Sequence, residues 1–465
     1  MLRRVRVAVV GAGVTGLVTA RELRARGHEV DVYERWPDVA GQASAFDLGN
    51  GVHLDRYYHH LFESDHHMIE LHEELLPGEL EWHRSSVGMY ARGRIWPFTT
   101  PRDLLTYSPL PLADRVRLGL AVMRLTRRDD WERMDGIPAA EWLRRACGER
   151  AYEGVWRPLL LGKFGDDAPD IPLAWLWSKL RLRRKLEGRS AGRELLGYPR
   201  GSFRAICVAL ADDIRGKGGR IHVDREVLAV ERDGAGWRLR LTGPGAYRAP
   251  AGTSAADLQA DAPADAVVIT APTQVASALA PWPDDYRRRI DAWTYRTAVV
   301  LLLELRRQFS GTYWVNIGES EVPFLGLVEH TNLVPAERYP ARYLYVSNYV
   351  AAGDPLTQLD TDELLAHYLR PLGVISPGFG RQDVLRAWSF REPAAQPVPK
   401  TGNRARILPF ETPLPGVYLA NTTQIYPEDR GTNYSVRLGQ EVAAAVGPAA
   451  TASGSGAAGG TGRQR

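Results

Sequence analysis

The 465 residues exceed what a single hydrophobic core usually organises, so we expect two domains. Hydrophobic residues make up 44% of the chain and charged residues 25%, which excludes an intrinsically disordered protein. The formal net charge of +4 suits an anionic small-molecule partner and does not indicate nucleic acid. The only cysteines, Cys147 and Cys207, are too few for a disulfide framework, so we expect a cytoplasmic location.

Residues 5–34 predict a βαβ unit that binds a dinucleotide. A continuous apolar strand at 5–10 is followed by a glycine-rich turn and an amphipathic helix, and a second strand ends at Glu34. The turn has the spacing Gly-x-Gly-x-x-Gly, which allows close approach of the backbone to a pyrophosphate and close packing of helix on strand. Glu34 is placed to accept hydrogen bonds from ribose hydroxyls. The three glycines are Gly11, Gly13 and Gly16.

Histidines are concentrated just after this unit, where seven of the eleven lie between residues 53 and 83. Imidazole is a common metal ligand, but no HExxH motif or other ligand spacing occurs, so we predict no metal site. We expect His66, His67 and His72 to be exposed near the start of a helix.

Helical periodicity dominates residues 61–195, which we assign to a substrate domain. Two stretches there, 115–128 and 175–189, are basic and amphipathic. Such stretches can contact a membrane surface or an anionic substrate, although a solvated helix face packed through its apolar side is the favoured alternative. No apolar run in the chain approaches the ~18 residues of a membrane-spanning helix.

The second half of the chain alternates between the two predicted domains. The apolar run 264–272 predicts a buried strand that joins the first parallel sheet, whereas the Gly/Ala/Pro-rich stretch 243–264 predicts a surface loop. Long strands from Thr297 onward predict an antiparallel sheet with a helix behind it at 361–369. A last strand and helix then return to the first domain, and residues 448–465 predict a disordered tail.

Several segments resemble the group of FAD-dependent enzymes that includes flavin amine oxidases, protoporphyrinogen oxidases and carotene desaturases. The resemblance selects FAD over NAD, which would satisfy the same glycine turn, and it implies main-chain contacts to the adenine at Val227. Ala40 stands where the group has the first glycine of a pair. The other implied FAD contacts near it are Arg35, Gly41, Gln42 and Ser44. The segments are residues 34–46, 137–167, 198–210, 226–230 and 264–272.

The C-terminal part of the implied site departs from the group at residues 420–422, which read Ala-Asn-Thr instead of Ala-Gly-Asp or Ala-Gly-Glu. Asn421 or Thr422 would therefore contact the ribityl chain as a neutral hydrogen-bonding group. The amides of the last helix are implied to face the flavin, although Thr432 or Asn433 could instead serve only as its N-cap. The implied flavin contacts here are Arg430, Gly431 and Asn433.

Residues 59–75 also resemble UDP-galactopyranose mutase, whose His-x-Phe-His segment lies beside the flavin. His60 and Phe62 match that segment, and Glu63 replaces its second histidine. The resemblance implies that His60, with His59 beside it, lies near the flavin and acts as acid or base or holds a flavin carbonyl. Tyr57 and Tyr58 are expected to line the substrate cavity.

The resemblance implies an α/β fold, with a Rossmann-like FAD-binding domain of the glutathione reductase type and a discontinuous α+β substrate domain. The implied activity is FAD-dependent oxidoreduction, in which flavin N5 takes hydride from a C–N or C–C bond of a small molecule. A redox-neutral sugar mutase is the main alternative, and a flavin-binding protein without activity is a third. The oligomeric state stays open. The expected domains are 1–60, 196–290 and 405–447 for FAD, and 61–195 and 291–404 for the substrate.

Overall fold

The structure is a computed structural model that describes residues 5–184, 194–243 and 259–447. The predicted disordered tail, residues 448–465, lies outside the described residues. A five-stranded parallel sheet forms the first half, in the order β10-β2-β1-β14-β20, and confirms the predicted parallel arrangement. Its strands are β1 (Arg6–Val10), β2 (Glu29–Tyr33), β10 (Arg220–His222), β14 (Ala266–Ile269) and β20 (Val417–Leu419).

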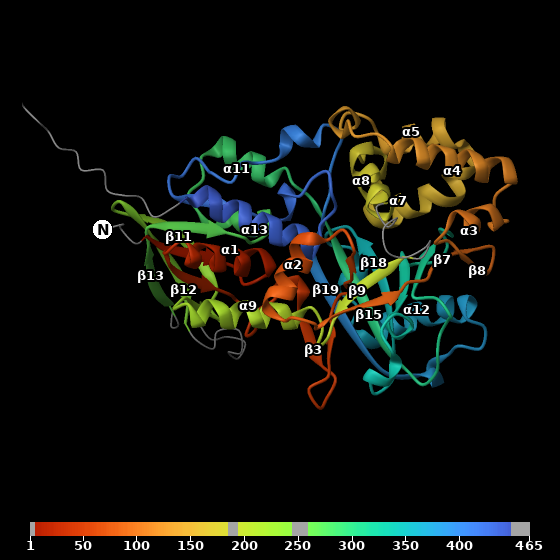
Figure 1. The fold of residues 1–465 in the computed structure, drawn as a ribbon, viewed down its shortest axis with the longest axis horizontal. Coiled ribbons are helices and arrows are strands. Elements are labelled where there is room, and N and C mark those ends of the chain that lie inside the picture. Colours follow the sequence, from red (N-terminus) through yellow and green to blue (C-terminus); the bar gives the residue numbers. More distant parts are fainter. Residues whose placement is uncertain (1–4, 185–193, 244–258, 448–465) are drawn as a thin grey trace, which may run out of the picture.

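The two faces of this sheet are covered differently, because successive side chains of a strand point to opposite faces. Val7 and Val9 of β1 pack with the helices α1, α9 and α13, whereas Ala8 and Val10 pack with a smaller antiparallel sheet. Figure 1 shows this smaller sheet at the end of the molecule that carries the N-terminus. The elements are α1 (Val14–Ala25), α9 (Arg204–Gly216), α13 (Thr432–Val446), β11 (Val227–Asp233), β12 (Gly236–Thr242) and β13 (Gln259–Ala264).

Strand β13 corrects the prediction that 243–264 is a surface loop. Residues 259–264 pair antiparallel with β12, with Ala262 opposite Leu239. Their alanine-rich composition resembles that of a loop, and only the pairing with a buried neighbour makes them a strand. Residues 244–258 lie outside the described residues.

A seven-stranded sheet, in the order β19-β15-β18-β17-β16-β7-β8, forms the second half. Its strands from Thr297 onward are antiparallel as predicted, and β16 pairs parallel with β7 from the segment that the sequence presents as mainly helical. The helix α12 (Thr361–Ile375) packs on it. The strands are β7 (Val87–Ala91), β8 (Arg94–Pro97), β15 (Tyr295–Leu305), β16 (Trp314–Ile317), β17 (Gly326–Glu329), β18 (Arg342–Val350) and β19 (Val384–Pro397).

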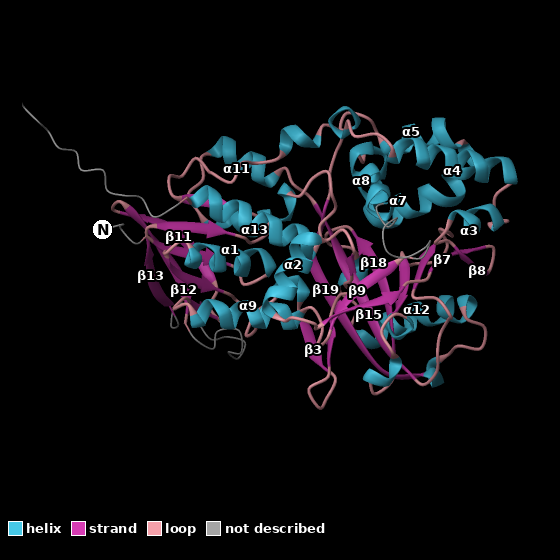
Figure 2. Ribbon diagram, viewed as in Figure 1, coloured by secondary structure: helices cyan, strands magenta, loops and turns pink. Residues whose placement is uncertain are grey.

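A helical module with its own apolar core lies beside this sheet, and Figure 2 shows its helices gathered at the upper right. Its members are α3 (Pro101–Thr106), α4 (Leu112–Thr126), α5 (Ala139–Cys147), α6 (Glu149–Ala151), α7 (Arg157–Phe164) and α8 (Leu173–Arg184). The remaining elements are β3 (Ala45–Asp47), β4 (His53–Asp55), β5 (Leu61–Phe62), β6 (Leu80–Arg84), β9 (Leu195–Pro199), α2 (His66–Leu75), α10 (Thr273–Leu279) and α11 (Asp284–Asp291). The exact division of the chain into two domains stays a prediction.

The prediction that His72 is exposed was wrong, because its side chain lies on the buried face of α2 and is fully buried, whereas His66 is exposed and His67 half-buried. In the described residues, no helix combines the length and apolar character needed to cross a membrane.

Candidate active site

A large cavity of about 1240 Å³ connects the parallel sheet with the helical module. Its wall begins at the glycine turn after β1, passes the start of α13 and the middle of β15, and ends among α4, α7 and α8. Every site residue predicted from the sequence lines this one cavity. They are Gly11, Gly13, Gly16, Glu34, Arg35, Gly41, Gln42, Ser44, His59, His60, Val227, Asn421, Thr422, Arg430, Gly431 and Asn433.

The glycine turn is shaped by close backbone contacts. Gly11 has a φ of +105°, a conformation that favours glycine, and a Cβ on Gly16 would lie 2.0 Å from the Gly11 carbonyl oxygen. A Cβ on Gly13 would meet nothing within 4 Å, so the space above Gly13 is open to a ligand. The first amides of α1 face this opening, which is the arrangement that binds phosphate.

Glu34 ends β2 beside this turn and is buried. Its carboxylate accepts hydrogen bonds from the amides of Ala12 (2.8 Å) and Trp36 (3.0 Å). Burial raises the pKa of Glu34, and the Ala12 amide opposes that shift. Each carboxylate oxygen keeps a further lone pair, so Glu34 can also accept from ribose hydroxyls.

Ala40, which stands where the similar enzymes have the first glycine of a pair, has a left-handed backbone with a φ of +99°. Its amide donates to the Ala12 carbonyl oxygen (2.9 Å), which ties the loop to the glycine turn. Behind it, a Cβ on Gly41 would lie 3.2 Å from the Cα of Gly13. The loop therefore keeps the path of the glycine pair, at the cost of backbone strain at one alanine.

Asn421 is held within its own loop. Its Oδ1 accepts from the amide (3.1 Å) and the hydroxyl (2.7 Å) of Thr423, and its Nδ2 donates to the carbonyl of Ala271 (3.0 Å). The structure therefore leaves Thr422, which is half-buried in the cavity wall and also forms a side-chain hydrogen bond with Tyr295, as the side chain that can contact a ribityl hydroxyl.

Among the described residues, no side chain caps the start of α13. Its N-cap residue is Gly431, and the side chain of Asn433 instead accepts a hydrogen bond from the amide of Met68 (3.1 Å). Asn433 is therefore not the N-cap. The first amides of α13 face the cavity and are available to an electronegative group there.

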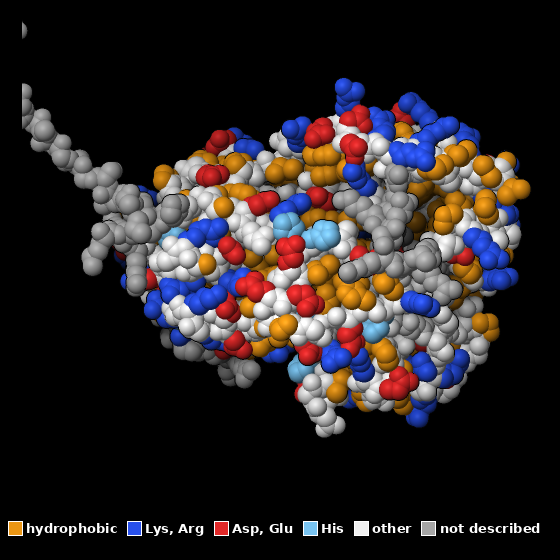
Figure 3. Space-filling model, viewed as in Figure 1, with side chains coloured by type: hydrophobic (Ala, Val, Ile, Leu, Met, Phe, Trp, Pro, Cys, Tyr) orange, Lys and Arg blue, Asp and Glu red, His pale blue; other side chains and the backbone are white. Residues whose placement is uncertain are grey.

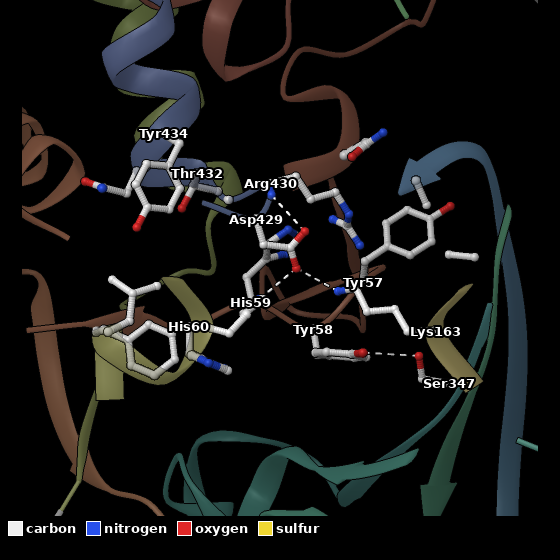
Figure 4. A pocket seen from close by; sticks show the side chains of 18 of the residues that line it. Tyr57, Tyr58, His59, His60, Lys163, Ser347, Asp429, Arg430, Thr432 and Tyr434 are labelled. Carbon is white, nitrogen blue, oxygen red and sulfur yellow. Dashed lines mark hydrogen bonds and ion pairs between the residues drawn. The ribbon is translucent and has the colours of Figure 1, made fainter. Parts of the chain in front are cut away.

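A charged cluster that the sequence did not reveal lies just before α13. The Nζ atoms of Lys163 and Lys179 are each 2.7 Å from the same oxygen of Asp429, and Gln396 donates to the other oxygen (2.9 Å). Figure 4 shows Lys163 pointing at Asp429 below the start of α13. The chain has only five lysines, and nothing in the sequence indicates that two of them meet at one carboxylate.

Burial acts on the pKa values of both Lys163 and Asp429 in this cluster. It lowers the pKa of Lys163, and Asp429 opposes that effect. Burial would raise the pKa of Asp429, but Lys163 and Lys179 hold it well below its ordinary value. The neighbouring Arg430 donates to the hydroxyl of Tyr349, while its buried Nε has no partner among the described residues.

His59 and His60 lie on the cavity wall below this cluster (Figure 4). Burial, with a contribution from Arg430, lowers the pKa of His59 to about 4, so its ring is neutral at physiological pH. The Nδ1 of His60 lies 3.1 Å from the hydroxyl of Tyr313. Tyr58, whose hydroxyl lies 3.2 Å from that of Ser347, and Tyr57 also line the cavity as expected.

The far part of the cavity, among the helices, is an apolar chamber. Aliphatic side chains from three helices supply most of its wall, and Trp156 and Trp175 add aromatic surface. Among the lining residues are Leu118, Val122, Leu159, Leu160, Leu176 and Leu180.

These features fit an extended anionic dinucleotide with a polar ring system at one end. The open space above Gly13 and the helix start beside it suit a pyrophosphate, and Glu34 suits a ribose. At the other end, the first amides of α13 and the Nε of Arg430, which have no partner among the described residues, can donate hydrogen bonds to an electronegative group. In the described residues, no group of three His, Cys, Asp or Glu side chains is placed to hold a metal ion.

Solved structures with this fold agree with the resemblance found in the sequence. A protein from Exiguobacterium sp. 255-15 named as a protoporphyrinogen oxidase superposes with a TM-score of 0.74 at 16% identity, covering 96% of this chain and 99% of that one. Reduced UDP-galactopyranose mutase gives a TM-score of 0.73 at 17% identity, covering 96% and 94%. At these identities the likeness establishes the fold alone, and it confirms the α/β class.

Sequence comparison adds relatives and a family. The zeta-carotene desaturase of Arabidopsis thaliana is 26% identical over 253 residues, which are 48% of this chain and 44% of that protein. The chain thus spans about half the length of the curated relatives it matches. The family model described as flavin containing amine oxidoreductase matches residues 14–446, nearly the whole described chain. The chain therefore belongs to the family of flavin-containing amine oxidoreductases.

Proposed function

We propose that this protein is an FAD-dependent oxidoreductase that oxidises a C–N or C–C bond of a largely apolar small molecule. The observation that carries the proposal is the continuity of one cavity, from the glycine turn at Gly13 to the apolar chamber among α4, α7 and α8. When bound, the flavin would supply the hydride acceptor.

The residues of the cavity wall would divide the binding of the cofactor among them. Glu34 would hold the ribose of the adenosine half, and the start of α1 would hold the pyrophosphate. At the other end, Arg430 and the first amides of α13 would stabilise negative charge on the ring system. The main chain at Val227 would contact the adenine.

Lys163 lies in the cavity wall and can serve as the base. Removal of hydride from one substrate atom leaves a proton to be taken from its neighbour in either an amine or a C–C substrate. Burial lowers the pKa of Lys163, which favours the neutral amine that takes up such a proton, and Asp429, which stays ionised, then stabilises the ammonium that forms. We assign Lys163 Nζ this role.

The first test is the cofactor itself. We expect the purified protein to be yellow and to release FAD on heat denaturation, and candidate amines and polyenes to bleach the bound flavin under anaerobic conditions. A colourless protein that does not take up added FAD would overturn the proposal.

A redox-neutral mutase is the second candidate, favoured by the fold likeness to the reduced mutase and by Arg56 and Arg430 in the cavity wall. The apolar chamber speaks against it, because a nucleotide sugar needs polar partners throughout its length. Turnover of a nucleotide sugar only after dithionite reduction, without net consumption of reductant, would decide for the mutase. A protein that binds FAD but passes neither test would be a flavin-binding protein without activity.

We also propose a cytoplasmic location, since both cysteines are free thiols.

Two lysines contact the single carboxylate of Asp429, so the cluster carries an excess of positive charge. This excess supports a substrate that carries an anionic group beside its apolar body. We propose no nucleic-acid partner.

A further inference from the structure

The outer surface of α3 and α4 carries an unusual set of exposed apolar side chains. Among the described residues nine large apolar side chains are exposed, and five of them lie on these two helices or at their ends. Four of the five recur at spacings of four, four and three along α4 and therefore share one helical face. Figure 3 shows hydrophobic side chains mixed with basic ones over this end of the molecule. We call this set the α3–α4 stripe; it consists of Leu105, Leu112, Val116, Leu120 and Met123.

Arginines border the α3–α4 stripe. Residues 112–128 contain five arginines and one acid, Asp114, which is already paired with Arg150 at 2.9 Å. Arg124 and Arg127 are exposed and form no ion pair or hydrogen bond with any described residue. The stripe is thus an apolar surface edged by uncompensated positive charge.

The stripe is also continuous with the cavity. Leu105, Val116, Leu120 and Met123 are exposed to solvent and also line the cavity, as does Arg127. The apolar chamber therefore opens to the surface within the stripe, and a molecule that entered there would meet apolar groups along its path.

We propose that the α3–α4 stripe docks onto the surface of a lipid bilayer that contains anionic lipids, so that the cavity opens toward the acyl chains. An amphipathic helix with arginines beside its apolar face has the composition that binds in the plane of such a surface. A second copy of this chain is a poorer occupant, because face-to-face pairing would bring two positively charged borders together. The inference does not depend on the proposed oxidation, since docking needs neither FAD nor substrate.

Vesicle flotation of the full chain tests the proposal. We expect the protein to float with vesicles of phosphatidylcholine and phosphatidylglycerol, to bind pure phosphatidylcholine more weakly, and to lose part of its binding at high salt. Val116→Asp, which puts a charge in the stripe, should lower the bound-to-free ratio at least about tenfold. The matched control is Val374→Asp, on the exposed face of α12, which should bind as the wild type does.

A double variant separates the charge from the apolar surface. Arg124→Glu with Arg127→Glu should lower binding to the anionic vesicles at least about tenfold and leave the weak binding to pure phosphatidylcholine unchanged. Circular dichroism must show that each variant is folded. The proposal is overturned if the wild type fails to float with anionic vesicles at low salt, if Val374→Asp loses as much binding as Val116→Asp, or if gel filtration reveals a dimer that Val116→Asp dissociates.

Discussion

Gly13 and Gly16 belong to the same turn, yet the structure gives them different tasks. Gly16 has no room for a side chain, because its Cβ would lie 2.0 Å from the Gly11 carbonyl oxygen. Gly13 has a φ of −73°, which any residue adopts, and has open space beside it. The fold therefore requires glycine at position 16, and the ligand requires glycine at position 13.

We predict that Gly16→Ala destabilises the protein by about 3 kcal/mol, the upper part of the range for overpacking a close contact. Gly13→Ala should keep the wild-type unfolding midpoint without cofactor but lower the affinity for FAD at least about tenfold, since a methyl group blocks approach to the pyrophosphate. Urea unfolding of the cofactor-free variants and titration with FAD measure the two effects. Equal loss of stability in both variants would contradict the assignment of a structural role to Gly16 and a ligand-binding role to Gly13.

Sequence patterns reveal residues whose neighbours lie close along the chain. The glycine turn and Glu34 were predictable because a strand, a turn and a helix follow each other directly. Lys163 and Asp429 were not, since 266 positions separate them and neither belongs to a motif. Only the packing of the helical module against the start of α13 brings them together.

The role assigned to Lys163 can be tested against its neighbour. Lys163→Met should slow reduction of the bound flavin by substrate at least about 100-fold and remove the rise of that rate with pH that titration of Lys163 produces. Lys179→Met is the matched control, because Lys179 contacts the same oxygen of Asp429 but is half-exposed. It should slow reduction less than about tenfold. Stopped-flow absorbance across a pH series measures both, and an unchanged pH profile in Lys163→Met would exclude it as the base.

Asp55, at the end of β4, makes stability depend on pH. Burial raises its pKa to about 7, although Tyr198 (2.7 Å) and the Phe203 amide (3.1 Å) donate to its carboxylate and oppose the shift. Because the folded pKa lies above the unfolded value of 3.8, the contribution of Asp55 is most favourable below the unfolded pKa and is lost as pH rises through 7.

The free energy of unfolding of the wild type should therefore fall by about 2–3 kcal/mol relative to that of Asp55→Asn between about pH 5 and about pH 8. Other groups titrate equally in both proteins and cancel in the difference. Denaturant unfolding of the two proteins at each pH measures this difference in the free energy of unfolding. Parallel pH dependences would contradict the assignment.

At the scale of elements, the close approach of α1 and α13 positions the two helix starts that face the cavity. A Cβ on Gly439 of α13 would lie 2.8 Å from the Thr15 carbonyl oxygen and 2.9 Å from the Cβ of Val18, so this glycine sets the separation of the helices. The sequence predicted both helices but not their contact, because helical periodicity gives the buried face and not the partner.

We predict that Gly439→Ala lowers the free energy of unfolding by about 1–2 kcal/mol, because overpacking outweighs the gain of up to about 1 kcal/mol that alanine has over glycine in a helix. It should also weaken FAD binding, since α13 moves away from α1. Glu441→Ala, exposed on the same helix, is the control and should cost no more than about 0.5 kcal/mol. Thermal unfolding and FAD titration of both variants test this, and a fully stable Gly439→Ala would refute the packing argument.

At the scale of the whole molecule, the cavity is assembled from segments that are far apart in the chain. Glu34 and Val227 lie at its adenosine end, and Arg430 lies near the other. The sequence indicated these segments singly, through local motifs and the family resemblance. Their convergence on one cavity, and its extension into the helical module, follow from the packing of the two halves.

Because the site spans both halves, a cofactor that reaches from one end to the other should stabilise the whole molecule. We predict that FAD at about 100 times its dissociation constant raises the unfolding midpoint by roughly 3–5 °C, from a linkage free energy of about 2.7 kcal/mol. FMN at the same concentration lacks the adenosine half and cannot use Glu34 or Val227, so it should raise the midpoint by less than half as much. Calorimetry of the cofactor-free protein with each flavin makes the comparison, and equal stabilisation by FMN would show that the glycine turn and Glu34 do not take part in binding.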